Sequence, residues 1–325
     1  MQKITILTRR VSIYAFIRKG VRNILRFLKY FILGGRIDTD ILFLSGHIAV
    51  TKSLLAGLKE TKADFIFNPI SEKDVSDTVV VLSDMSALAQ AITWKKEGKI
   101  KRLLAGPNLL DLPTERNKAL TAPEIDLIIV PSDMVKQIYE KLNPSLVGKI
   151  AIWYAGVDTN YWKPIQKEKE KEILVYWKNT TPKAFCLEVE AIIKKNGYSV
   201  NRVRYGHYNK QYYKNMLNRS AYAVVLSVTE TQSLALVEAW AMNVPTIVWY
   251  PEIEHSFIRG VITTAAPYLS EDTGVKWKEL NDLDSLLADN TLSSKTFSPR
   301  DWVLNNMTDR ISAELLIKIC GSITR

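Results

Sequence analysis

The chain has 325 residues, of which 47% are hydrophobic and 24% are charged, a balance that is typical of a globular protein and excludes disordered and fibrous classes. Its two cysteines, Cys186 and Cys320, have no C-x-x-C spacing, so neither a disulfide framework nor a structural zinc site is indicated, and we infer a reducing compartment. The net charge of +10 comes almost entirely from residues 1–37, which hold nine basic residues and no acidic one.

Residues 9–36 have the pattern of a basic amphipathic helix. Aliphatic and aromatic residues cover one side, and the other side carries five cations: Arg18, Lys19, Arg22, Arg26 and Lys29. Such a helix can lie in the interface of an anionic membrane, although a solvated helix packed on its domain is about equally compatible. No run of about 18 apolar residues and no signal-peptide pattern occurs, which disfavours spanning and secretion. Nucleic acid is not expected as a partner, because no base-reading motif accompanies the charge.

Short β-rich runs alternate with helical patterns through the first half of the chain, which is typical of βαβ units on a parallel sheet. We predict strands at 3–7, 40–46, 64–69, 78–84, 101–107, 126–132 and 149–156, with helices near 47–60, 85–97 and 133–142. This half, residues 1–162, is expected to form an N-terminal Rossmann-like domain that includes the basic segment.

A charged run at 165–172, "IQKEKEKE", reads as a solvated linker, and a second alternating set follows it. Strands are predicted at 172–178, 199–206, 221–227 and 245–250, with helices near 182–196, 209–218 and 232–242. Residues 171–300 would form a second Rossmann-like domain, and a helix within 301–325 would return to the first. Two such α/β domains face a cleft, with ligands beyond the carboxyl ends of the strands.

Two glutamates lie eight residues apart in "VTETQSLALVEAWAMNVP", residues 228–245. A helix predicted to begin at Thr231, Gln232 and Ser233 would present free backbone amides to a phosphate, with Glu230 beside them. Glu238 would lie roughly 12 Å further along that helix, in apolar surroundings where a carboxylate needs a partner. The alternative is an acidic helix start followed by a buried structural ion pair.

This segment resembles the E-x7-E region of retaining nucleotide-sugar glycosyltransferases of the GT-B fold, especially glycosyltransferase family 4. The resemblance implies that Glu230 contacts the donor sugar, that Glu238 holds the ribose, and that the turn from Thr231 to Leu234 holds the diphosphate. "YWKNTTPKAF" is similar to the family's basic motif, which implies that Lys178 and Lys183 neutralise the diphosphate. The loop at Gly206 and His207 would approach the base.

Two departures from the family pattern affect the expected site. Ser233 stands where the family has a glycine, and "LLAGPNLL" stands where the family has a catalytic-site histidine. Acceptor-side candidates are therefore Gly46 and His47, which follow a predicted strand, together with Gly106 and Asn108. Gly34 with Gly35 is the alternative acceptor loop, and His255 is read as a surface residue.

The expected function is transfer of a sugar from a nucleotide-sugar donor to a membrane-associated glycan or glycolipid, with retention of configuration. "DTD" at residues 38–40 precedes a predicted strand and is read as a turn, so no essential metal and no cofactor beyond the donor are expected. The enzyme would act in the cytoplasm, peripherally on the inner face of the membrane. Alternatives are a nucleotide-sugar epimerase of the same fold and a catalytically silent partner of a membrane or another transferase.

Overall fold

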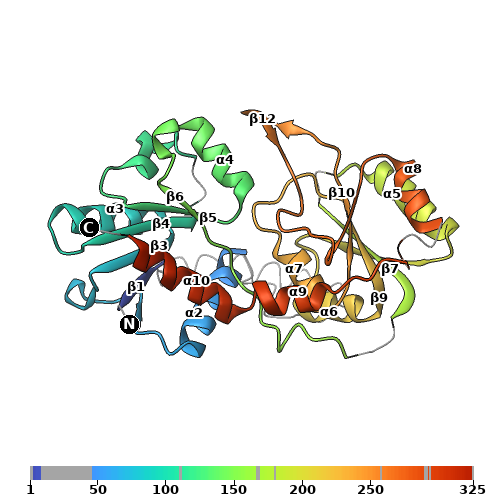
Figure 1. The fold of residues 1–325 in the computed structure, drawn as a ribbon, viewed down its shortest axis with the longest axis horizontal. Coiled ribbons are helices and arrows are strands. Elements are labelled where there is room, and N and C mark those ends of the chain that lie inside the picture. The colour runs from blue at the N-terminus through green and yellow to red at the C-terminus, as the bar shows by residue number, and fades with distance from the viewer. Residues whose placement is uncertain are drawn as a thin grey trace, which may run out of the picture.

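The computed structural model describes residues 3–8, 46–109, 112–165, 169–178, 181–256, 258–288, 292 and 294–323. These residues form two α/β units, each built on its own parallel sheet (Figure 1). The predicted fold class, two Rossmann-like domains, is confirmed. The basic segment at 9–36, Gly34, Gly35, the "DTD" turn and the predicted strand from residue 40 to 45 lie outside the described residues.

The N-terminal unit has a six-stranded parallel sheet in the order β2-β1-β3-β4-β5-β6. Its strands are β1 (Ile4–Leu7), β2 (Phe65–Phe67), β3 (Thr78–Ser83), β4 (Arg102–Asn108), β5 (Leu127–Val130) and β6 (Ile150–Ile152). Its helices are α2 (Gly46–Glu60), α3 (Met85–Lys96) and α4 (Asp133–Leu142), with short 3₁₀ turns η2 (Glu72–Asp74), η3 (Arg116–Thr121) and η4 (Pro144–Leu146). Every residue of β3 is buried, as expected of a central parallel strand covered by helices on both faces.

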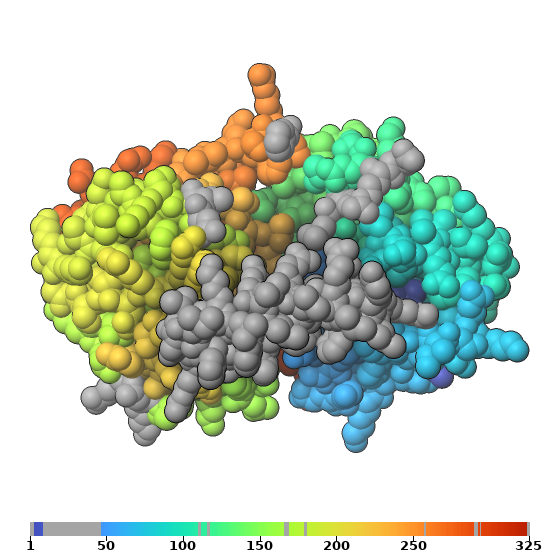
Figure 2. Space-filling view, turned by 180° about the vertical axis from the view of Figure 1, so that it is seen from behind, coloured from blue at the N-terminus to red at the C-terminus, as the bar shows by residue number. Residues whose placement is uncertain are grey.

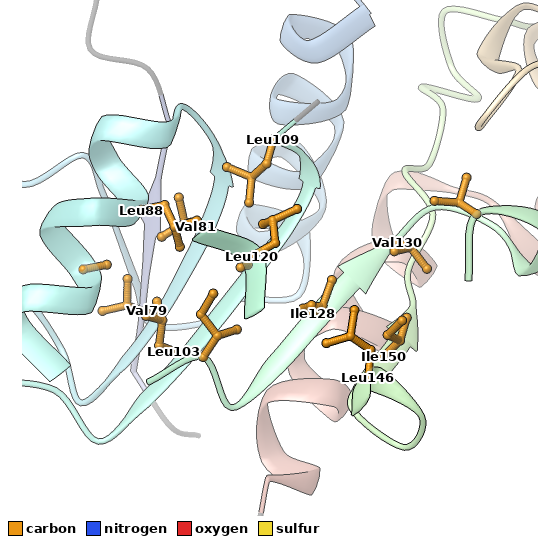
Figure 3. Close-up of a cluster of buried hydrophobic side chains, with 14 of the residues drawn as sticks. Val79, Val81, Leu88, Leu103, Leu109, Leu120, Ile128, Val130, Leu146 and Ile150 are labelled. Carbon is orange, nitrogen blue, oxygen red and sulfur yellow. The ribbon is translucent and has the colours of Figure 1, made fainter. Parts of the chain in front are cut away.

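Alternate residues of the N-terminal strands feed two separate cores. On one face, Val79, Val81 and Leu103 pack with Leu88 of α3 and with Ile128 (Figure 3). On the other face, the intervening strand residues pack on α2 and on the helix that ends the chain, α10 (Asp309–Ser322). The period of two along each strand thus explains why these sequences are continuously apolar.

The C-terminal unit has a five-stranded parallel sheet in the order β13-β10-β9-β7-β8. Its strands are β7 (Glu170–Trp177), β8 (Ser199–Arg204), β9 (Ser220–Val225), β10 (Thr246–Trp249) and β13 (Gly274–Trp277), and an antiparallel hairpin joins β11 (Glu254–His255) to β12 (Ile258–Ile262). Its helices are α5 (Lys183–Lys195), α6 (Lys210–Arg219), α7 (Leu234–Ala241), α8 (Leu280–Ala288) and α9 (Pro299–Asn306).

Two sequence-based expectations about this unit are corrected. The charged run is not all linker, because β7 begins at Glu170 and the side chain of Glu172 is buried beside Asn201 and Arg219, whose guanidinium donates to it at 3.0 Å. Helix α7 begins at Leu234, so the three residues before it form a turn and the eight-residue spacing of the glutamates is not a continuous helical rise.

The two units meet at both ends of the space between them. Helices α9 and α10 cross from the C-terminal to the N-terminal unit, and α10 lies along α2 (Figure 1). At the opposite end, β12 packs against α4, where the Lys141 ammonium donates to the carbonyls of Arg259 and Gly260 at 3.0 and 2.8 Å. Figure 2 shows this meeting of orange hairpin and green helix at the top of the molecule. The carboxyl ends of the strands of both sheets are thereby held across one interdomain space.

Candidate functional site

The C-terminal sheet reverses its strand order between β7 and β9, because β8 lies on one side of β7 and β9 on the other. In open α/β sheets, ligands bind beyond the carboxyl ends of the strands at such a reversal. Lys178 follows β7 directly, and Glu230 lies in the loop after β9. The fold therefore brings a cation and a carboxylate that are 52 residues apart to the usual ligand position.

Lys178 and Glu230 form an ion pair, with 2.5 Å between Nζ and Oε1. The side chains are 25% and 16% exposed, so the pair is reachable by a ligand yet largely withdrawn from water. The ammonium also lies 4.6 Å from the ring centroid of Tyr205, a cation–π contact that helps to orient it. Burial raises the pKa of Glu230, and Lys178 acts in the opposite direction.

The turn from Thr231 to Ser233 connects Glu230 to α7 and offers unpaired backbone groups. Ser233 has φ 53° and ψ 50°, the left-handed conformation that glycine adopts most readily. This geometry explains why related patterns have glycine there. The amides of the turn and of Leu234 have no backbone acceptor among the described residues, and the buried Gln232 Oε1 has no partner. A turn of this kind, leading into a helix, is suited to a phosphate.

Glu238 lies on α7, one helical turn after Leu234, and both side chains line the space between the units. No hydrogen bond or ion pair holds the Glu238 carboxylate among the described residues. Burial raises its pKa to about 7, with the positive charge of Lys210 acting in the opposite direction. A partly buried carboxylate without a partner in the empty protein is a ready acceptor for ligand hydroxyl groups.

Three tyrosines pack close to the two glutamates. Tyr208 and Tyr213 have ring centroids 5.0 Å apart, and Tyr176 lies 6.3 Å from Tyr208. Burial raises the pKa of Tyr208, and the charges of Glu238 and Glu230 raise it further. The phenol of Tyr208 is thus a neutral group within electrostatic reach of both carboxylates.

A pocket of about 330 Å³ lies between the two units beside Glu238. Helix α2 contributes Lys52 and Ser53 to its wall, α6 contributes Lys210, and α10 contributes Asp309. Its volume is at the lower end of the range for small-molecule sites. The pocket forms where α2 and α10 lie next to α6 and α7 of the C-terminal unit.

The other predicted donor-side residues are less enclosed. Lys183 is the first residue of α5, and its side chain is exposed, without an ion pair within the described chain. Gly206 has φ 77° in the exposed turn after β8, and His207 beside it is exposed as well. Tyr208, the next residue, is the one that approaches Glu238. No motif singled out Tyr208, although an aromatic residue just after the expected base-binding loop is a usable signal.

The acceptor-side candidates lie in the N-terminal unit, at different points. Gly46 and His47 begin α2, and burial lowers the pKa of the partly exposed His47. Gly106 lies inside β4, where a Cβ atom would come within 2.0 Å of the Ile129 carbonyl oxygen, so close strand packing explains this glycine. Asn108 ends β4, and its buried Nδ2 has no hydrogen-bond partner among the residues that the structure describes.

Within the described residues, no group of three His, Cys, Asp or Glu side chains is placed to hold a metal ion. Over the same residues, every helix is too short or too polar to cross a bilayer. The five predicted membrane-facing cations, Arg18 to Lys29, lie outside the described residues. The expected absence of an essential metal, and the membrane contact, therefore stay predictions.

Solved structures share this architecture at low sequence identity. A lipopolysaccharide outer core galactosyltransferase, WaaB in its apo form, matches with a TM-score of 0.57 at 11% identity, covering 99% of both chains. HepE from Anabaena, in complex with UDP, matches with a TM-score of 0.54 at 10% identity, covering 99% of this chain and 100% of its own. The catalytic domain of starch synthase IV from Arabidopsis thaliana, bound to ADP and acarbose, matches with a TM-score of 0.51 at 11% identity, covering 90% of this chain and 79% of its own.

A scan against protein-family models and a search of curated protein sequences give no match. The arrangement of the two sheets is the GT-B fold, as these structural neighbours have it. At such low identity the likeness establishes the fold alone. Membership of glycosyltransferase family 4, and the roles that its E-x7-E motif implies, stay predictions.

Proposed function

We propose that this protein is a glycosyltransferase that uses a nucleotide-sugar donor. The observation that carries the proposal is the Lys178–Glu230 ion pair at the strand-order reversal, with Glu238 eight residues later and without a partner in the described part of the chain. A cation for phosphate and two carboxylates for hydroxyl groups, joined by a turn with free amides, match the parts of a nucleotide sugar. The GT-B neighbours, which include a galactosyltransferase and a protein bound to UDP, support the same class of ligand.

Donor binding would exchange the partner of Lys178. In the empty protein the ammonium neutralises Glu230. When the diphosphate arrives, Lys178 binds it together with the amides between Thr231 and Leu234, and the Glu230 carboxylate turns to a hydroxyl of the donor sugar. Glu238 accepts hydrogen bonds from the ribose. In the empty protein the ion pair thus neutralises the charges of two donor-binding groups, Lys178 and Glu230.

In the reaction, the bond between the anomeric carbon and the phosphate oxygen breaks, the acceptor hydroxyl oxygen forms the new bond to that carbon, and the hydroxyl proton passes to the departing phosphate oxygen. Negative charge accumulates on the departing nucleoside diphosphate. Lys178 and the turn amides stabilise that charge, and Lys183 assists on the evidence of the family resemblance alone. This leaving-group stabilisation would dominate the rate. We propose retention of configuration and independence of metal on the same resemblance.

The acceptor is proposed to be a lipid-linked or membrane-bound glycan, as in cell-surface polysaccharide synthesis, with the enzyme on the inner face of the membrane. Support comes from the cations between Arg18 and Lys29 in the sequence. Neutralising all five should abolish binding to phosphatidylglycerol vesicles without affecting nucleotide binding. Unchanged vesicle binding would overturn the membrane assignment.

The activity can be tested by nuclear magnetic resonance of nucleotide sugars incubated with the protein and a membrane extract. We expect donor consumption only with acceptor, and Glu230→Gln should slow it by about a hundredfold or more. Glu314→Gln, on the exposed side of α10, is the matched control. Consumption without acceptor would indicate an epimerase instead. No consumption by the wild-type protein would favour a silent binding partner.

A further inference from the structure

The wall opposite Glu238 in the interdomain pocket contains buried polar atoms that the fold leaves unused. Ser53 is 8% exposed, and its Oγ makes no hydrogen bond within the described part of the chain. Oδ1 of Asp309 is likewise buried without a partner, and both residues line the pocket. Burial raises the pKa of Asp309 to about 6, and the nearby Ser53 acts in the opposite direction, although the two atoms do not have the geometry of a hydrogen bond. Unpartnered buried polar atoms are costly and rare, so a pair of them in one wall indicates a ligand.

This wall is held rigidly in place. A Cβ atom on Gly57 of α2 would come within 1.9 Å of the Asp309 carbonyl oxygen, so the two helices are in direct backbone contact. Leu54 and Leu58 on α2 and Leu316 on α10 are fully buried in the same core. Asp309 and Ser53 therefore keep a fixed position relative to the N-terminal sheet, and they meet Glu238 only across the interdomain space.

The pocket charges suit a ligand rich in hydroxyl groups. Burial raises the pKa of both Glu238 and Asp309, and the charge of Lys210 acts in the opposite direction on each, so its ammonium is within electrostatic reach of both carboxylates. Carboxylates only accept hydrogen bonds, whereas a serine hydroxyl can donate or accept. A volume of about 330 Å³ admits a sugar ring or a nucleoside, but not a whole nucleotide sugar.

We propose that Asp309 and Ser53 form the second wall of the ribose site, so that the ribose hydroxyls of the donor are held by Glu238 on one side and by the N-terminal unit on the other. The proposal rests on the proposed function, because it takes the ligand of Glu238 to be the nucleoside part of the donor. It makes Asp309 a specificity-determining residue, which selects ribose over sugars without the 2′ and 3′ hydroxyls. It also makes nucleotide binding a direct link between the two units.

The test compares UDP with its 2′,3′-dideoxy counterpart by titration calorimetry, and uses ADP and GDP pairs if UDP does not bind. The wild-type protein should prefer the ribonucleotide. Asp309→Asn should reduce that preference about tenfold, because a hydrogen bond to a charged acceptor is replaced by a neutral one. Ser53→Ala should reduce the preference in the same direction and by less. Glu314→Gln, further along α10 on its exposed side, should leave the preference unchanged.

Each outcome decides between the claims. The second wall would be overturned if Asp309→Asn and Ser53→Ala each weakened the binding of both nucleotides equally, or if neither variant weakened the binding of any nucleotide. If Glu238→Gln reduces the ribose preference while Asp309→Asn and Ser53→Ala do not, the proposed function stands and this inference fails. If the wild-type protein binds no nucleoside diphosphate of the three bases, both fail. If Asp309→Asn does not fold, Ser53→Ala alone carries the comparison.

Discussion

Replacing Glu238 by glutamine should stabilise the empty protein, and the gain should grow with pH. Glutamine keeps the shape of the side chain but removes a carboxylate that has no partner among the described residues. Burial raises the pKa of Glu238 from its ordinary value of 4.5 to about 7. The folded protein therefore binds the proton more tightly than the unfolded chain does.

The sign and size of the effect follow from that shift. Stability from this proton is fully present below pH 4.5 and is lost as the pH rises through 7. Between pH 5 and pH 8 the wild-type protein should lose about 2.5 kcal/mol through this one group, since each pKa unit is worth about 1.4 kcal/mol. The variant cannot lose it. Lys210 and Asp309 face the same pocket in both proteins, so their contributions largely cancel in the comparison.

The assay is urea unfolding of both proteins at several pH values from 5 to 8. The difference in unfolding free energy should rise with pH by about 2 kcal/mol, while Glu314→Gln, exposed on α10, should show a flat difference. The same variant should bind nucleotide more weakly, which is the usual exchange of activity for stability at a functional site. A stability difference that stays constant or falls with pH would refute the reasoning about Glu238.

Three further results are expected. Ser233→Gly should raise the unfolding free energy by about 0.5–1 kcal/mol, because Ser233 has φ 53°, and a loss measured by urea unfolding would contradict the left-handed turn. Gly57→Ala should destabilise the protein by about 2 kcal/mol or more, because the new Cβ would meet the Asp309 carbonyl oxygen at 1.9 Å; an unchanged melting temperature would contradict the α2–α10 packing. Lys178→Met should weaken UDP binding about tenfold, and it should raise the pKa of Glu230 because it removes the neighbouring cation. Glu230 would then take up a proton at higher pH, and calorimetric titration with UDP at pH 6 and 8 checks both effects. Unaltered binding would exclude Lys178 from the phosphate site.

The local sequence pattern was enough to predict most strands of the two sheets and most of the helices between them. Short apolar runs between turn residues are typical of buried strands, and few other structures accommodate them. It failed where a charged residue is buried by distant partners. Glu170 reads as linker in the sequence, before the strand predicted from Glu172, but β7 begins there. Arg219 donates to both glutamates, and Asn201 donates to Glu172. No pattern marked the hairpin β11–β12 either, since its apolar residues pack on α4 of the other unit.

The candidate site divides in the same way. The E-x7-E spacing and the basic residue after β7 are local features, so Glu230, Glu238 and Lys178 could be named from the sequence. Their pairing could not, because the 2.5 Å contact between Lys178 and Glu230 depends on β7 and β9 being neighbours in the sheet.

The sequence by itself was enough to predict the fold class, because it follows from the periodicity of the strands and helices. The candidate donor-side residues were predicted from the resemblance of motifs within single strand–turn–helix units. Only the tertiary structure decided which groups share a pocket. Ser53, Lys210 and Asp309 are more than 250 residues apart at their extremes, and no sequence pattern relates them. They come together because α10 returns to pack on α2. The burial of the apolar faces of these two helices drives that packing, and the polar residues of the pocket take no part in it.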